Sequence, residues 1–106
     1  PMPNSFVTNL YPKPTPGTTM ETIALDSDST PEGKTTTYSS LTKYIAMDVQ
    51  DADARVRFDG TSVSQSTGHR LYAGRSYTFS KAALENASFI RAGSTTSNLY
   101  LTEFTD

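Results

Sequence analysis

Alternation of apolar and polar residues between positions 44 and 60 is the feature that most constrains this fold. The stretch reads YIAMDVQDADARVRFDG. In it, Ile45, Met47 and Val49 alternate with polar or small residues, and Val56 and Phe58 alternate with charged ones. A period of two places one set of side chains on each face of a β-sheet. We therefore predict two strands joined by an acidic turn, a hairpin with one apolar face that joins a core.

Short segments of the same kind follow this predicted hairpin. Strand-like alternation recurs in four segments, at 69–73, 76–80, 88–92 and 98–105. In the last of them, Leu99, Leu101 and Glu103 share one face. The segment 80–87 is rich in Ala and starts with Ser80, a good N-cap residue, so it predicts one helix of about two turns. Together the segments predict an all-β fold, a small β-sandwich or barrel-like domain with one short helix.

The prolines divide the chain into two parts. All six lie near the N-terminus, at Pro1, Pro3, Pro12, Pro14, Pro16 and Pro31. Proline has no N–H to donate to a sheet, so we predict an extended Pro-rich N-terminal arm over 1–33 and a β domain over 34–106. Within the arm, 20–25 could form a short edge strand. Within the β domain, 34–40 could form a weakly buried strand that runs into the strand starting at Tyr44.

Composition limits the functions that this chain can have. Apolar residues make up 35% of its 106 residues, which is low for a self-sufficient small domain and favours a homo-oligomer or a docked subunit. The absence of cysteine excludes disulfides and thiol chemistry. The net charge of −2 argues against a nucleic-acid partner. No apolar run approaches a membrane span, and no signal peptide is evident. Pro1 is consistent with removal of an initiator Met, so we expect synthesis in a cytoplasm.

Candidate catalytic and metal-binding residues are few. His69 is the only histidine, and we expect it to be a surface or contact residue. Four aspartates of the predicted hairpin could supply oxygen ligands for Ca²⁺, at Asp48, Asp51, Asp53 and Asp59. Their spacing does not match an EF-hand loop, and aspartates also form ordinary turns, so ion binding stays open. We expect no enzyme activity and no cofactor.

Arginines and aromatic residues are the better candidates for binding. Five arginines lie on or beside predicted strands, at Arg55, Arg57, Arg70, Arg75 and Arg91. Arginine forms bidentate pairs with carboxylates at interfaces, so these residues predict salt bridges between subunits, with a solvated mixed-charge face as the alternative. We expect Phe58 and Phe89 to be buried. A surface pocket lined by Tyr72, Tyr77 or Tyr100 would instead favour carbohydrate binding.

Residues 44–104 resemble a known group of proteins. The pattern consists of Asp53-Ala-Arg-Val-Arg-Phe-Asp-Gly60, Gly68-His-Arg-Leu71, Ala73-Gly74, Tyr77-Thr78-Phe79 and Phe89-Ile-Arg-Ala-Gly-Ser-Thr95, followed by a strand with an aromatic end. It resembles small structural proteins of tailed bacteriophages. The resemblance implies a virion component, most simply a decoration or cement protein that binds and stabilises the capsid shell. A head–tail joining protein and a carbohydrate-binding or receptor-recognition module remain alternatives.

The same resemblance implies partners and a location. The partner would be the major capsid protein, the oligomer a homotrimer, and the location the virion, assembled in the host bacterial cytoplasm. It carries no recognised functional residue. From the residues themselves, we predict that the apolar side chains of the arm contact a neighbouring subunit or the shell, together with one arginine of the body. These predicted contact residues are Phe6, Val7, Leu10, Tyr11, Ile23, Leu25 and Arg57.

Overall fold

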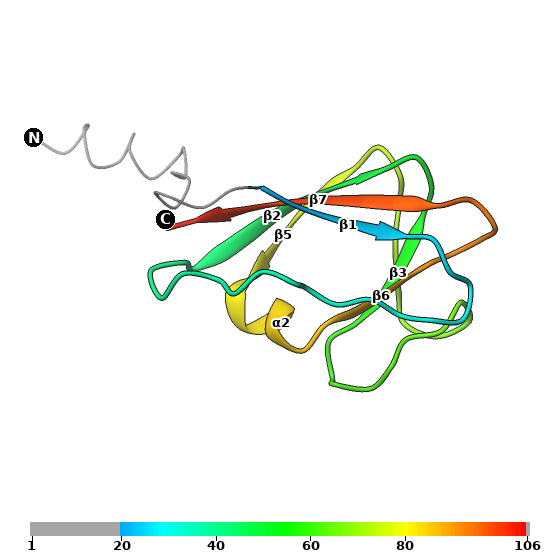
Figure 1. Cartoon of the computed structure of the whole chain (residues 1–106), viewed down its shortest axis with the longest axis horizontal. Helices are drawn as coiled ribbons and strands as arrows, with labels where there is room; N and C mark the ends of the chain where they lie inside the picture. Colours follow the sequence, from blue (N-terminus) through cyan, green and yellow to red (C-terminus); the bar gives the residue numbers. More distant parts are fainter. Residues whose placement is uncertain (1–19, 106) are drawn as a thin grey trace, which may run out of the picture.

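The computed structural model describes residues 20–105, which form two antiparallel sheets and one short helix (Figure 1). Sheet A has the order β1-β7-β2-β5, and sheet B has the order β4-β3-β6. The strands are β1 (Glu21–Leu25), β2 (Tyr44–Gln50), β3 (Ala54–Arg57), β4 (His69–Leu71), β5 (Ser76–Ser80), β6 (Ser88–Arg91) and β7 (Ser97–Phe104), and the helix is α2 (Lys81–Glu85). The predicted all-β class with one short helix is confirmed.

The core lies between the two sheets and follows the predicted alternation. In β2, Ile45, Met47 and Val49 are all buried, and they pack in one cluster with Val56 of β3 and Phe89 of β6. The intervening residues of β2 and β3 are partly or fully exposed, because successive side chains of a strand alternate between its faces. The faces predicted for β2 and for Val56 of β3 are therefore confirmed.

The predicted hairpin between β2 and β3 is wrong. β2 pairs with β5 and β7 in sheet A, whereas β3 pairs with β4 and β6 in sheet B. The chain crosses from one sheet to the other at residues 51–53, where Asp51 has a φ of 76°. Aspartate tolerates this left-handed conformation better than most residues, and Asn98 Nδ2 donates to its carboxylate at 2.7 Å. The acidic stretch is thus a corner between sheets.

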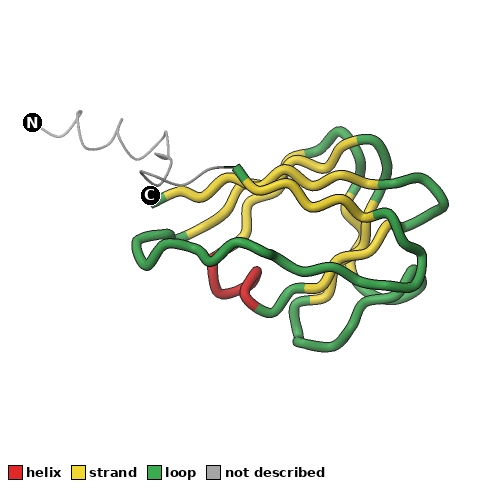
Figure 2. Tube along the Cα trace, viewed as in Figure 1, coloured by secondary structure: helices red, strands yellow, loops and turns green. Residues whose placement is uncertain are grey.

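The segment 34–40 is irregular, so the strand predicted there is wrong (Figure 2). Several N–H and hydroxyl donors of this segment bond to two buried carboxylates. These donors do not pair with the backbone of a neighbouring strand. Glu21 Oε2 accepts from the N–H and the hydroxyl of Thr35 at 2.6 and 2.7 Å. Glu103 Oε1 accepts from Ser39 N–H at 3.0 Å and from Thr42 Oγ1. These bonds hold the segment against sheet A, and its Tyr38 is buried in the core cluster.

The strand predicted at 20–25 is present as β1, over Glu21–Leu25, but it is part of the β body. β1 lies at the edge of sheet A, pairs with β7 from Glu21↔Leu101 to Leu25↔Ser97, and buries Ile23 and Leu25 in the shared core. The boundary predicted between an arm and a β domain at 33/34 therefore does not separate β1 from the body. Positions 1–19, with most of the prolines, lie outside the described residues.

The elements after residue 68 follow the sequence prediction closely. Gly74 turns the chain between β4 and β5 with a φ of 83°, a conformation that glycine adopts without strain. Ser80 caps α2, where its side chain accepts from Ala83 N–H at 3.1 Å. β7 buries alternate residues along its length, including Leu99, Leu101 and Glu103. These local signals were sufficient because each depends on residues close together in the chain.

Candidate functional site

A surface groove lies where β3 ends and β4 begins. It has a volume of about 530 Å³ and is lined by Arg57, Phe58, Asp59, Gly68 and His69. These residues combine two aromatic rings with a cation, a carboxylate and exposed backbone. Pockets that recognise small ligands or single side chains of a partner combine apolar walls with a few placed polar groups in the same way. We take this groove as the candidate site.

The floor of the groove depends on a glycine. Gly68 has a φ of 100°, and a Cβ at this position would lie 2.7 Å from Val56 O and 2.9 Å from Val63 Cγ2. Only glycine fits such a close approach without displacement of the backbone. The preceding loop is tied to β6, because Val63 N–H donates to Ser88 Oγ at 3.0 Å. The groove therefore rests on a fixed loop.

The apolar wall of the groove belongs to a row of aromatic side chains between β4 and β5. The Phe58 ring lies 6.1 Å from the His69 ring and 5.2 Å from the Phe79 ring, and Tyr77 stacks on Phe79 at 6.2 Å. Phe58 is only partly buried, so the prediction that it belongs to the closed core is wrong, whereas Phe89 is buried as predicted. Phe58 lies just beyond the end of β3, at the open side of the two sheets.

The polar wall is a bidentate ion pair. Arg57 Nη2 and Nε donate to the two carboxylate oxygens of Asp59 at 2.6 and 3.2 Å, and Thr61 N–H donates to the same carboxylate at 3.1 Å. These hydrogen bonds, that from Arg57 first, lower the pKa of Asp59 to about 2, and the Asp59 bond raises the pKa of Arg57. The pair is thus charged at neutral pH and is fixed in orientation before any ligand binds.

The other predicted arginines have several different environments. Arg70 Nη2 donates to Asp53 at 2.8 Å, and Arg55 Nη1 donates to Gly68 O at 3.1 Å. Arg57 and Arg70 thus form their salt bridges within this chain. Whether arginines also bridge subunits remains a prediction.

The four aspartates do not converge on one point. Asp48 accepts from Ser76, Asp51 from Asn98, Asp53 from Arg70 and Ala73, and Asp59 from Arg57 and Thr61. The bond from Ala73 N–H, followed by that from Arg70, lowers the pKa of Asp53. Within residues 20–105, no group of three or more His, Cys, Asp or Glu side chains is placed to hold a metal ion. Each aspartate fixes a local turn or strand end.

The predicted contact residues divide into three groups. Arg57 lies on the surface at the groove, with 30% of its side chain exposed. Ile23 and Leu25 are 5% and 2% exposed, so they pack inside this chain and are not available to a neighbouring subunit, because β1 belongs to the body. The four remaining residues lie outside the described part of the chain, at Phe6, Val7, Leu10 and Tyr11.

The groove itself was missed from the sequence. From the sequence, a pocket lined by tyrosines would have favoured carbohydrate binding, whereas the rings that line the groove are those of Phe58 and His69. Tyr72 is 48% exposed at the β4–β5 turn, and Tyr77 is partly buried in the aromatic row. Gly60 and Gly68 were the available signal in the sequence, because glycines often mark turns, and both do have positive φ in the structure. Their spacing alone did not reveal which side chains the turns would bring together.

The residues that carry the bacteriophage resemblance lie in both sheets. They supply sheet B, the turn after β4, the aromatic pair of β5 and most of β7, and several of them contact one another through the Asp53–Arg70 ion pair and the Phe58–His69 and Phe58–Phe79 rings. The chain matches no known protein family, no curated protein and no solved structure. Within residues 20–105, no helix has the length and apolar character needed to cross a membrane.

Proposed function

We propose that this chain is a structural protein of a tailed-bacteriophage virion, a decoration protein that binds the capsid shell and stabilises it. The observation that carries the proposal is that resembling residues from separate strands meet at the groove. Residues far apart in the sequence, Phe58, His69 and Phe79, meet at the groove beside Arg57. Such clustering is expected if the pattern reflects a shared binding surface.

In this proposal the groove receives a side chain of the major capsid protein or of another copy of this chain. Interfaces derive most of their affinity from a few aromatic or arginine contacts in well-packed pockets. Phe58 and His69 would pack against an inserted apolar side chain, and Arg57, oriented by Asp59, would bond to a polar group at its rim. A homotrimer placed around a symmetry axis of the shell is the assembly that the resemblance favours.

The test is reattachment to particles that lack this protein. Purified particles are mixed with wild-type chain or with Arg57→Glu, and occupancy is measured by quantitative mass spectrometry and cryo-EM. We expect Arg57→Glu to lose occupancy while its circular dichroism spectrum is unchanged, and Lys43→Glu, which reverses an exposed cation away from the groove, to bind as wild type. Unchanged occupancy of Arg57→Glu would contradict the proposal. A copy number of only a few per particle would favour a head–tail joining role.

Carbohydrate binding is a second candidate, favoured by the chemistry of the groove. An aromatic ring beside charged, planar side chains can hold a sugar, since the ring packs on the C–H face and the polar groups bond to hydroxyls. Phe58, Arg57 and Asp59 provide this combination. A glycan array with wild type and Phe58→Ala separates the candidates: glycan binding that Phe58→Ala abolishes would favour receptor recognition.

A further inference from the structure

The turn between β4 and β5 presents an exposed aromatic ring between two cations. Tyr72 is 48% exposed, and the guanidinium carbons of Arg70 and Arg75 lie 5.8 and 5.4 Å from the centre of its ring. Significant cation–π contacts occur roughly once per 70–80 residues in proteins, so two on one ring are a notable concentration. We call Arg70, Tyr72 and Arg75 the β4–β5 tip.

The tip is held in place by the backbone bonds of its turn. Ala73 N–H donates to Asp53 Oδ1 at 2.8 Å, and Gly74 N–H donates to Val49 O at 2.7 Å. Tyr72 N–H donates to the phenol oxygen of Tyr77, in the neighbouring aromatic row, at 2.9 Å. A surface that is already ordered loses little conformational entropy when it binds. The tip is therefore suited to recognition of a partner.

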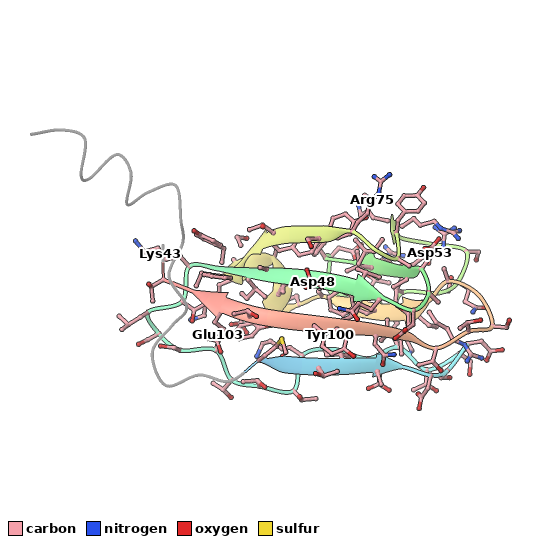
Figure 3. All side chains as sticks on the ribbon, turned by 90° about the horizontal axis from the view of Figure 1, so that it is seen from above. Lys43, Asp48, Asp53, Arg75, Tyr100 and Glu103 are labelled. Atoms are coloured by element: carbon pink, nitrogen blue, oxygen red, sulfur yellow. The ribbon has the colours of Figure 1, made fainter. Side chains whose placement is uncertain are left out.

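The two arginines of the tip differ in their charge partners. Arg70 is paired with Asp53, whereas Arg75 makes no ion pair within the described part of the chain. Arg75 also borders a cavity of about 270 Å³ that Asp48 and Ser76 help to line. Because Asp48 brings negative charge to that side, a carboxylate would approach Arg75 from the side of the Tyr72 ring. Figure 3 shows Arg75 projecting from one edge of the body, well away from Lys43.

We propose that the β4–β5 tip is a contact surface for a carboxylate-bearing segment of a partner protein. Arg75 binds the carboxylate with its fork of N–H groups, and Tyr72 packs against the adjoining side chain. Tyrosine and arginine are enriched among the residues that dominate interface affinity. Single-stranded nucleic acid also binds aromatic and cationic groups, but it carries a phosphate charge at every nucleotide, which would have to pass Asp48 and Asp53 on a chain with a net charge of −2, whereas a single carboxylate can reach Arg75 alone. A protein partner is therefore favoured, whether or not it belongs to a capsid.

The test is an NMR titration of the ¹⁵N-labelled full chain with a defined probe. The probe is an acetylated, amidated peptide of sequence Glu-Asp-Tyr-Glu-Asp, compared with the Gln/Asn version and with a short single-stranded oligonucleotide. We expect saturable shifts of the Arg75 Nε–Hε and Tyr72 amide signals with the acidic peptide only. Arg75→Gln and Tyr72→Ala should each weaken binding at least about tenfold, whereas Tyr72→Phe should retain binding.

Lys43→Gln is the matched control, because it removes an exposed cation that lies well away from the tip. It should bind the acidic peptide as wild type does. Equal binding of the neutral peptide, an unchanged affinity of Arg75→Gln, or no shifts at the tip would overturn the proposal. Preferential shifts with the oligonucleotide would also overturn it and would assign the tip to nucleic acid. All variants change exposed side chains, and their amide spectra report whether the fold is intact.

Discussion

Replacement of Glu103 should show how much the buried carboxylates contribute to stability. Glu103 is 4% exposed, and its Oε1 accepts from Ser39 N–H at 3.0 Å and from the Thr42 hydroxyl. Ser39 O also accepts from Lys81 Nζ at 3.0 Å, so this carboxylate holds a turn that links β7 to the start of α2. Loss of the acceptor should therefore loosen the irregular segment before β2.

The magnitude follows from the contacts. A hydrogen bond to a charged group contributes roughly 1.5–3 kcal/mol, and one between neutral groups roughly 0.5–1.5 kcal/mol. Glu103→Gln keeps a carbonyl acceptor and avoids the desolvation of a buried charge, so it should cost about 1 kcal/mol. Glu103→Ala leaves Ser39 N–H without this acceptor and leaves a void, so it should cost about 3–5 kcal/mol.

Urea and thermal unfolding, followed by circular dichroism, measure the stability of both variants. Hydrogen exchange at the Ser39 amide reports the local effect. Glu103→Ala should lower the Tm by more than about 12 °C, given roughly 4–8 °C per kcal/mol for a domain of this size. Thr102→Ala is the control, because Thr102 lies on the same strand but faces outward, and it should change stability by less than about 0.5 kcal/mol. If Glu103→Ala were as stable as this control, the turn would not depend on the carboxylate.

Three further predictions follow from the core, the groove and the N-terminal segment. Phe89→Ala should cost about 3–5 kcal/mol and the partly buried Phe58→Ala only about 1–2 kcal/mol; equal losses in urea unfolding would mean that Phe58 is a core residue. The folded pKa of Asp59, about 2, lies below the ordinary value of 3.8, so its stabilisation is complete above pH 3.8 and is lost as the pH falls towards 2. Asp59→Asn should reduce the dependence of the free energy of unfolding on pH between 3.8 and about 2. An unchanged pH dependence would contradict a stabilising role for the Asp59 carboxylate. Deletion of residues 1–16 should leave the body folded, by circular dichroism and thermal melting, but reduce attachment to particles; full attachment of the truncated chain would exclude a binding role for this segment.

Much of the fold was predictable because its signals are local. The alternation around Ile45 and Met47 and the inward face shared by Leu99 and Leu101 each follow from the strand geometry of one short segment. The cap at Ser80 likewise requires only the neighbouring turn of the helix. Even the buried position of Glu103 follows from its place in the alternation of β7.

Tertiary structure decided which segments became neighbours. The alternation in β2 and β3 is compatible with a hairpin, yet the chain turns a corner at Asp51 and places the two strands in different sheets. Likewise, the threonines and serines of 34–40 could serve a strand, but Glu21 and Glu103 accept their hydrogen bonds. The groove required Gly68 to approach Val56 closely. These outcomes depend on long-range pairing of polar groups and on contacts between distant residues, and a local pattern does not specify them.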